Sequence, residues 1–137
     1  YAFDHNHEGS LDETKALVGG KGANLAVMTS ELGLPVPPGF TISTGACRLY
    51  LTAGWPDGLE SEIRDHIGRM ERAVDRRFGD PSAPLLVSVR SGAPVSMPGM
   101  MDTILYLGIN KATVRGLVES SGDADLVEAC RDRFVST

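Results

Sequence analysis

Two short stretches of this sequence combine residue types that bind phosphate groups. The first is Gly19-Gly20-Lys21-Gly22, at the start of a segment with helical periodicity. Successive glycines let backbone N–H groups converge on one point, a helix N-terminus adds a partial positive charge, and Lys21 adds a full one. The stretch is neither a Walker A loop nor a GxGxxG fingerprint, since Leu25 stands where the third glycine would be. A flexible turn with a solvated lysine is the alternative interpretation.

The second stretch, SVRSGAPVSMPGMMDT, runs from Ser88 to Thr103 and follows an apolar run. Arg90 there offers a planar fork of donors that suits a phosphate group. Glycines in the loop allow close backbone approach, and its methionines are soft enough to cover a flat heterocycle. The loop residues that we expect to face a ligand are Gly92, Met97, Gly99, Met100, Met101, Asp102 and Thr103. The alternatives are methionines in a core, Arg90 paired with a surface carboxylate, and Asp102 closing a turn.

The free energy that nucleotide binding requires predicts that the two stretches act together. A helix N-terminus contributes roughly 0.3–1 kcal/mol to anion binding at a surface. Micromolar affinity needs about 8 kcal/mol. A nucleotide site would therefore need Lys21, Arg90 and an apolar slot for the base, each contributing.

Other reactive side chains give weaker signals. A His-x-His pair such as His5 and His7 can bind metal, but no cysteine or carboxylate cluster supports it, so we expect solvated side chains. His66 is expected on the surface of a helix. Cys47 and Cys130 lack metal-site or redox spacing, which predicts free thiols in a reducing compartment, the cytoplasm. No carboxylate pair is placed for magnesium.

Composition bounds the class of protein. The 137 residues are 42% hydrophobic and 23% charged, as in a globular domain with a core. A net charge of −5 argues against a nucleic-acid partner. Apolar runs are too short to span a membrane, and the first residues lack signal-peptide features. We therefore expect a cytoplasmic protein with no nucleic-acid or membrane partner.

Strand-like and helix-like segments alternate, which predicts an α/β (α+β) fold. Gly33 is expected to end the helix that begins at Gly19, and the prolines of LPVPPGF exclude helix after it. A polar linker is expected before Gly19. The predicted strands are Tyr1–Phe3, Phe40–Thr44, Leu85–Val89 and Thr103–Leu107. Two further helices are predicted to begin after N-caps at Thr44 and Asn110, and two others are predicted at Gly58–Phe78 and Leu126–Phe134. An apolar stripe near the end suggests a piece of a longer protein.

The blocks GGKGANLAVMTSELGLPVPPGFTIST and LLVSVRSGAPVSMPGMMDTILYLGIN resemble the N-terminal nucleotide-binding domain of the pyruvate, phosphate dikinase family. The run SMPGMMDT resembles this branch more than the related phosphoenolpyruvate synthases and glucan water dikinases. The resemblance implies an ATP-grasp-like fold. It also implies a layout in which 1–57 and 84–110 carry the nucleotide site, 58–83 is a charged helix, and 111–137 begins a helical subdomain.

The resemblance also implies a specific enzymatic function. The family is a phosphotransferase family that interconverts ATP, phosphate and pyruvate with AMP, pyrophosphate and phosphoenolpyruvate through a phosphohistidine. Carried over by position, Lys21 and Arg90 contact the ATP phosphates, Gly99, Met100, Met101, Asp102 and Thr103 line the nucleotide, and Gly19, Gly20 and Gly22 complete the loop. Magnesium would accompany ATP, with ligands outside this sequence. The partners implied are the phosphohistidine and pyruvate domains of the chain and a homodimer of the full enzyme.

The phosphohistidine motif does not occur here, so the resemblance assigns no catalytic residue, and we expect the 137-residue chain alone to be inactive. Two alternatives stay open. One is a non-catalytic nucleotide-binding or interaction module that kept the fold. The other is another dikinase of the phosphoenolpyruvate synthase superfamily.

Overall fold

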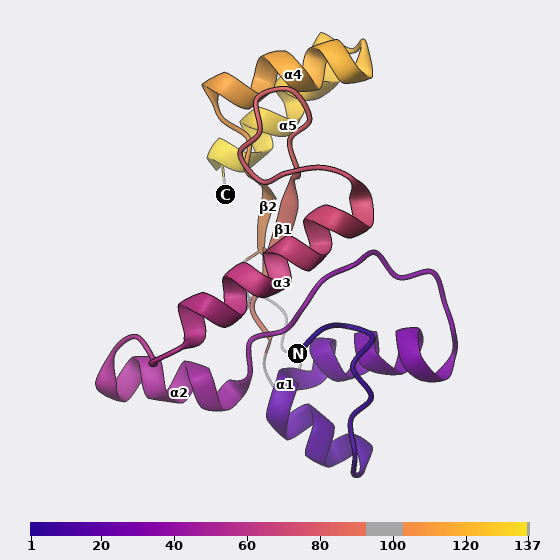
Figure 1. Cartoon of the computed structure of the whole chain (residues 1–137), viewed down its shortest axis with the longest axis vertical. Coiled ribbons are helices and arrows are strands. Elements are labelled where there is room, and N and C mark those ends of the chain that lie inside the picture. Colours follow the sequence, from indigo (N-terminus) through magenta and orange to yellow (C-terminus); the bar gives the residue numbers. More distant parts are fainter. Residues whose placement is uncertain (93–102, 137) are drawn as a thin grey trace. The chain divides into compact units, whose positions relative to one another are not determined.

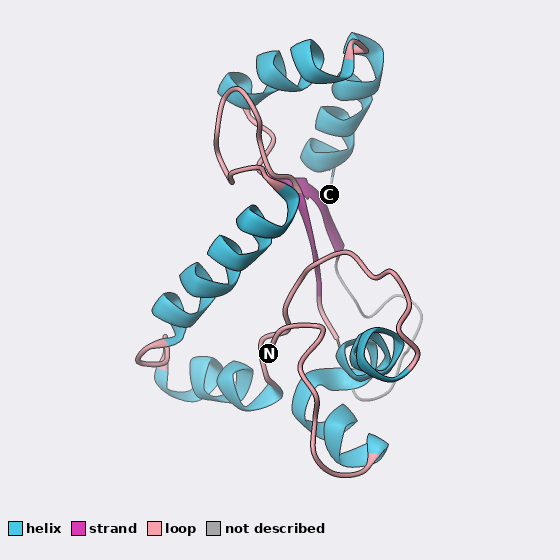
Figure 2. Cartoon of the chain, turned by 45° about the vertical axis from the view of Figure 1, so that its right-hand side comes forward, coloured by secondary structure: helices cyan, strands magenta, loops and turns pink. Residues whose placement is uncertain are grey.

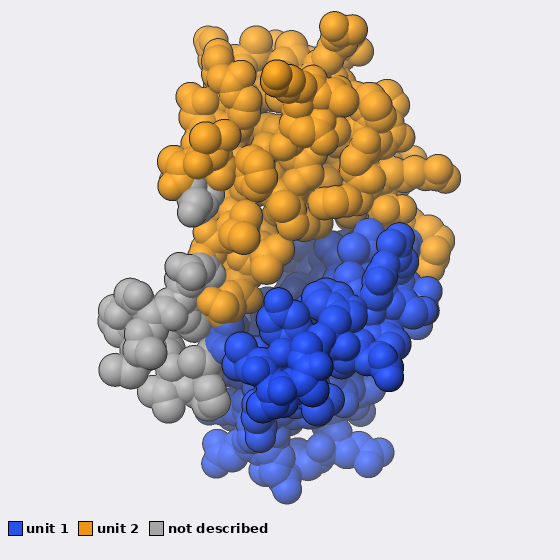
Figure 3. Space-filling model, turned by 90° about the vertical axis from the view of Figure 1, so that its left-hand side faces the viewer, with its two compact units in different colours: residues 1–70, 92–100 blue, residues 71–91, 101–137 orange. Residues whose placement is uncertain are grey.

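The computed structural model describes residues 1–92 and 103–136. These residues form two compact units, one made of 1–70 with Gly92 and the other of 71–91 with 103–136 (Figure 3). Helices predominate, and the strands form one small sheet (Figure 2). The first unit contains Gly19–Gly22 and also Gly92 of the second stretch, whereas Arg90 and Thr103 of that stretch belong to the second unit.

The first unit begins with helix α1, Leu11–Ala26, which is interrupted at Gly19 (Figure 1). The polar linker expected before Gly19 is therefore wrong, because a helical turn already starts at Leu11. Ser10 caps it: its side chain accepts from the Glu13 backbone N–H while Glu13 accepts from the Ser10 backbone N–H. This Ser-x-x-Glu capping box satisfies two backbone donors that a helix start leaves without partners.

The capping box predicts a measurable pH effect. Hydrogen bonds from the Ser10 backbone N–H and then from its hydroxyl lower the pKa of Glu13 below its ordinary value of 4.5. A depressed folded-state pKa stabilises the fold above the unfolded-state value, and this stabilisation is lost as the pH falls through the folded-state pKa. We expect Ser10→Ala to raise the pKa of Glu13 toward its ordinary value, measured by NMR of the side-chain carboxyl carbon. Asp80, whose pKa is lowered by its own hydrogen bonds from Ser82 and Ala83, is the internal control and should not move.

After α1 the chain forms a π-helical turn, η1, Val27–Glu31, and Gly33 follows with a φ of 60°. This confirms Gly33 as the left-handed residue that ends the helix. The proline-rich segment after it has no helix, as expected. The strands expected at Tyr1–Phe3 and Phe40–Thr44 are reduced to one bridge between Ala2 and Phe40.

Helix α2, Thr44–Ala53, confirms a helix here, but its N-cap is Ser43 and not Thr44. The Ser43 side chain accepts from the Ala46 backbone N–H at 3.2 Å. Helix α3, Leu59–Val74, confirms the charged helix but ends before Phe78, because Asp75 already has a φ of 53°. An exposed ion pair joins Arg64 to Glu60 one turn away, at 2.7 Å.

The second unit contains an antiparallel pair of strands, β1, Val87–Arg90, and β2, Thr103–Leu107. The register pairs Val87 with Leu107, Val89 with Ile104, and Arg90 with Thr103, with a bulge between the first two pairs. β2 is as predicted, whereas β1 starts two residues later than the predicted strand.

Helices α4, Lys111–Ser121, and α5, Ala124–Ser136, complete this unit, and α5 packs against both α4 and β2. Asn110 caps α4 as predicted, and its side chain accepts from the backbone N–H groups of Ala112 and Thr113. The core of the unit is small. Its buried residues are Pro84, Leu85, Ile109, Thr113, Gly116 and Val127.

Thr113 is fully buried, and its hydroxyl accepts from the Asn110 backbone N–H at 2.8 Å and lies 3.0 Å from the Gly108 carbonyl, to which it can donate. Thr113→Val keeps the shape but leaves both backbone groups without this partner. We expect the free energy of unfolding of this unit to fall by about 1–3 kcal/mol. The measurement is urea denaturation with amide exchange of α4 as the local probe. Thr52→Val is the matched control, because Thr52 is exposed on α2 and its change should lie within about 0.5 kcal/mol.

The helices with a small antiparallel sheet agree with the α+β part of the predicted fold class. Both cysteines are free thiols in the structure. No helix among the described residues is both long and apolar enough to cross a membrane.

Candidate functional site

The first predicted phosphate-binding stretch lies at the interruption of α1. Gly19 is buried and has a φ of 76° and a ψ of 168°, a conformation that is essentially restricted to glycine. The second helical part of α1 starts after it, so Gly20, Lys21 and Gly22 occupy its first turn. The predicted helix start at this motif is confirmed. The N–H groups of such a turn have no partner within the helix and are free to meet an anion.

Two contacts hold this helix start in place within the first unit. A side chain at Gly22 would press on Val18 and on Thr41 at 3.0–3.2 Å, so glycine allows the close packing. The Thr44 hydroxyl donates to the Ala16 carbonyl at 2.6 Å, in the last turn before the interruption. The sequence predicts Thr44 only as an N-cap. Adjacent Ser43 and Thr44 signal a cap, but no local pattern shows that the second hydroxyl reaches a residue 28 positions away.

Gly92, from the second predicted stretch, lies next to this helix start. A Cβ added to Gly19 would stand 3.6 Å from the Gly92 carbonyl carbon. The fold therefore brings together two glycine-containing segments that are 73 residues apart in the sequence. Both residues belong to the first unit.

Arg90 and Thr103 lie in the second unit, where they are partners across the two strands. Arg90 is the last residue of β1 and Thr103 is the first residue of β2, so the segment that connects the two strands runs between them. The Arg90 side chain is exposed. The predicted ligand-facing residues Met97, Gly99, Met100, Met101 and Asp102 belong to that connection and lie outside the described residues.

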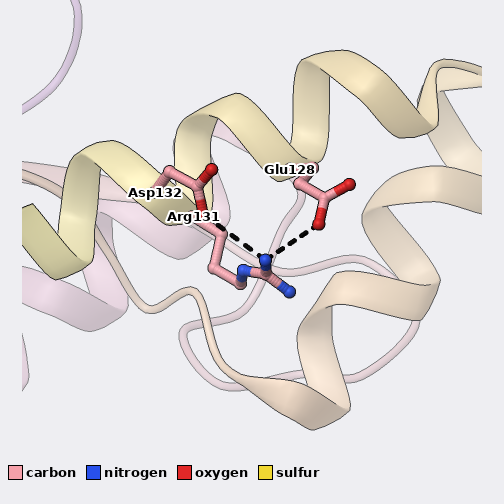
Figure 4. A network of polar contacts seen from close by, with 3 residues as sticks. All are labelled: Glu128, Arg131 and Asp132. Atoms are coloured by element: carbon pink, nitrogen blue, oxygen red, sulfur yellow. Dashed lines mark hydrogen bonds and ion pairs between the residues drawn. The ribbon is translucent and has the colours of Figure 1, made fainter.

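Lys21 and Arg90 make no ion pair within the described parts of the chain, 1–92 and 103–136. Arg131 differs, because it lies 2.9 Å from Glu128 and 3.4 Å from Asp132 on the exposed side of α5 (Figure 4). Two carboxylates compensate its charge, which makes Arg131 a poor phosphate receptor.

Two hollows in the described surface are formed by other residues than those of this site. One is a pocket of about 70 Å³ that Phe40, Thr41 and His66 help to line, and the other is an apolar groove of about 350 Å³ beside Ile109, Val114 and Phe134. Neither is lined by Lys21 or Arg90. The first is too small for a nucleotide, since ligand pockets usually measure about 300–1,000 Å³.

Comparison with known proteins gives a consistent result. Residues 15–56 match the family described as pyruvate phosphate dikinase, AMP/ATP-binding domain. The chain is 53% identical over 130 residues to a pyruvate, phosphate dikinase of Rhizobium meliloti, which covers 93% of this chain and 14% of that protein. It is 54% identical over 136 residues to the chloroplastic pyruvate, phosphate dikinase 1 of Oryza sativa, with 96% and 14% covered. The Giardia intestinalis enzyme of the same name is 47% identical over 131 residues, with 95% and 15% covered. The chain thus spans about one seventh of the length of these relatives.

Proposed function

The chain belongs to the pyruvate, phosphate dikinase family, and we propose that it forms one part of the ATP-binding site of such an enzyme. The whole enzyme would interconvert ATP, phosphate and pyruvate with AMP, pyrophosphate and phosphoenolpyruvate through a phosphohistidine. The ATP-grasp-like fold, the cytoplasmic location and the homodimer implied by the resemblance belong to the same proposal. The phosphohistidine and pyruvate domains would be supplied by the rest of a longer chain.

One observation carries the proposal for this chain: Gly19, at the glycine-rich helix start, lies against Gly92. Arg90 precedes Gly92 by two residues, and two residues of extended chain span at most about 7 Å. Arg90 is therefore joined to the segment that meets Gly19 by a single intervening residue. We propose, as the resemblance implies, that Lys21 and Arg90 both contact the ATP phosphates.

The roles follow from the chemistry of the side chains. The backbone N–H groups at Gly20–Gly22 and the Lys21 ammonium would neutralise phosphate oxygens, and the Arg90 guanidinium would bind two oxygens of one phosphate. Thr103 faces Arg90 across the strands and would border the nucleotide, as would Gly99, Met100, Met101 and Asp102. Positioning and charge neutralisation are the main protein contributions to phosphoryl transfer.

Magnesium would enter this site bound to ATP. Within residues 1–92 and 103–136 there is no group of three or more His, Cys, Asp or Glu side chains that could hold a metal ion. We therefore assign none of the described residues to the metal.

The test is an NMR titration of the isotope-labelled chain with magnesium-ATP. We expect amide shifts at Gly19–Ala23, at Arg90 and at Thr103. Lys21→Ala and Arg90→Ala should each weaken binding about tenfold to hundredfold, because a hydrogen bond to a charged group contributes about 1.5–3 kcal/mol.

The matched controls are Lys15→Ala, in the first part of α1, and Arg115→Ala, on α4. Both remove the same kind of charge from positions outside the two predicted phosphate-binding stretches and should leave the affinity unchanged. Equal weakening in all four variants would show a non-specific charge effect and contradict the assignment of Lys21 and Arg90. A folded chain that shows no shifts with ATP would contradict a site formed by these residues alone.

A further inference from the structure

The N-terminal segment brings His5 and His7 together. Their ring centroids are 4.7 Å apart, with an angle of 72° between the planes. The Tyr1 ring lies 5.0 Å from the His5 ring and 5.2 Å from the His7 ring, so three rings form one cluster. The sequence shows only the His-x-His spacing, whereas the structure shows that both imidazoles lie on one side of the chain.

The backbone on both sides of this pair is anchored. On one side, Phe3 donates to the Gly39 carbonyl at 2.9 Å, and the His5 N–H donates to the Ala2 carbonyl at 3.0 Å, which closes a turn. On the other side, Ser10 begins the capping box of α1. The two histidines therefore lie on a short segment held at both ends, which reduces the entropy lost when both bind one ligand.

We propose that His5 and His7 form a two-imidazole binding site for a borderline divalent cation of the Zn²⁺ class. Imidazole is a preferred ligand for Zn²⁺, Ni²⁺ and Cu²⁺, whereas Mg²⁺ and Ca²⁺ prefer oxygen ligands. Water would complete the coordination, since no third His, Cys, Asp or Glu side chain joins the pair among the described residues. The site uses none of the residues assigned to ATP.

Binding at this pair would tie the first residues to the start of α1. Tyr1 and Phe3 are paired with the backbone of Gly39 and Thr41, while Ser10 and Glu13 fix the helix start. A cation held by His5 and His7 between these two points would stabilise the folded state by mass action. The expected consequence is a melting temperature that rises with the concentration of free Zn²⁺.

The experiment is a titration of the untagged 137-residue chain with ZnCl₂ at neutral pH, followed by the imidazole C–H resonances of its three histidines. We expect the resonances of His5 and His7 to shift together and saturate with one equivalent, while those of His66 stay in place. No nucleotide is present, so the result is independent of the proposed ATP site.

Single-residue variants test which histidines bind Zn²⁺. His5→Asn and His7→Asn should each weaken Zn²⁺ binding at least tenfold and abolish the rise in melting temperature. His66→Asn is the matched control, because His66 stacks on Phe40, with ring centroids 4.9 Å apart, and has no ring contact with His5 or His7 among the described residues. This variant should bind like the unchanged chain. The proposal is overturned if Zn²⁺ causes no saturable shift, if His66 shifts equally, or if either single variant retains full affinity.

Discussion

Gly116→Ala is expected to destabilise the second unit by about 3 kcal/mol or more, although alanine is the better helix former. Gly116 lies inside α4 and is buried against the backbone of Pro81 and Ser82. An added Cβ would fall on the Pro81 carbonyl oxygen and lie 3.0 Å from the Ser82 Cα. These atoms belong to the backbone, so the clash can be relieved only by moving α4 or the 81–82 segment.

Gly45→Ala is the matched control for this prediction. Gly45 lies in the first turn of α2, where, among the described residues, an added Cβ would meet only the Ser43 hydroxyl oxygen, at 3.8 Å. The same substitution should there stabilise the chain by about 0.5–1 kcal/mol. Urea denaturation, with amide exchange of α4 and α2 as local probes, measures both changes. A gain in stability at both positions would contradict the close packing of α4 on Pro81.

The elements that the sequence predicts well carry strong local signals. Asn110 and Gly33 are conventional helix boundary residues, and Thr103–Leu107 has β-branched and apolar residues between turn residues. The spacing of apolar residues also predicts the charged helix α3. Its end is less certain from the sequence, since the apolar repeat continues to Phe78 while the backbone leaves the helix at Asp75.

The errors arise where one signal competes with another. The alternating pattern of Phe40–Thr44 favours a strand, but Ser43 caps α2. Pairing with the first residues is limited to the bridge between Ala2 and Phe40 and the backbone hydrogen bonds between Tyr1 and Thr41. The Ser10-x-x-Glu13 capping box is visible in the sequence and would have predicted the first part of α1. This part of the helix is polar because it buries little apolar surface, and its polar composition suggested a linker.

The candidate site could be predicted only in part for a physical reason. Glycines, a lysine and an arginine reveal their chemistry locally, and Gly19 does adopt a backbone conformation that requires glycine. The contact between Gly19 and Gly92, the pairing of Arg90 with Thr103, and the bond from Thr44 to Ala16 join positions distant in the sequence. Such contacts depend on the packing of whole elements, which no short pattern specifies.

Gly19→Ala is expected to affect both stability and nucleotide binding. An added Cβ would find ordinary contact distances to Gly92, 3.6–3.9 Å, so the cost is not a clash. It comes from a backbone conformation, φ 76° and ψ 168°, that alanine rarely adopts. We expect the free energy of unfolding of the first unit to fall by about 1–3 kcal/mol, measured by urea denaturation.

The chain can relieve this strain by changing the interruption of α1, and Lys21 and the N–H groups beside it then change direction. The proposed ATP site should lose at least about tenfold in affinity, which corresponds to about 1.4 kcal/mol. Gly33→Ala is the control, because Gly33 also has a positive φ, 60°, and lies at the other end of the same helical segment. No described residue lies within 4 Å of its added Cβ. It should cost about 1–2 kcal/mol of stability and leave ATP-induced amide shifts unchanged. If both variants weaken ATP binding equally, the effect reflects stability alone, and the interruption at Gly19 does not position Lys21 for phosphate.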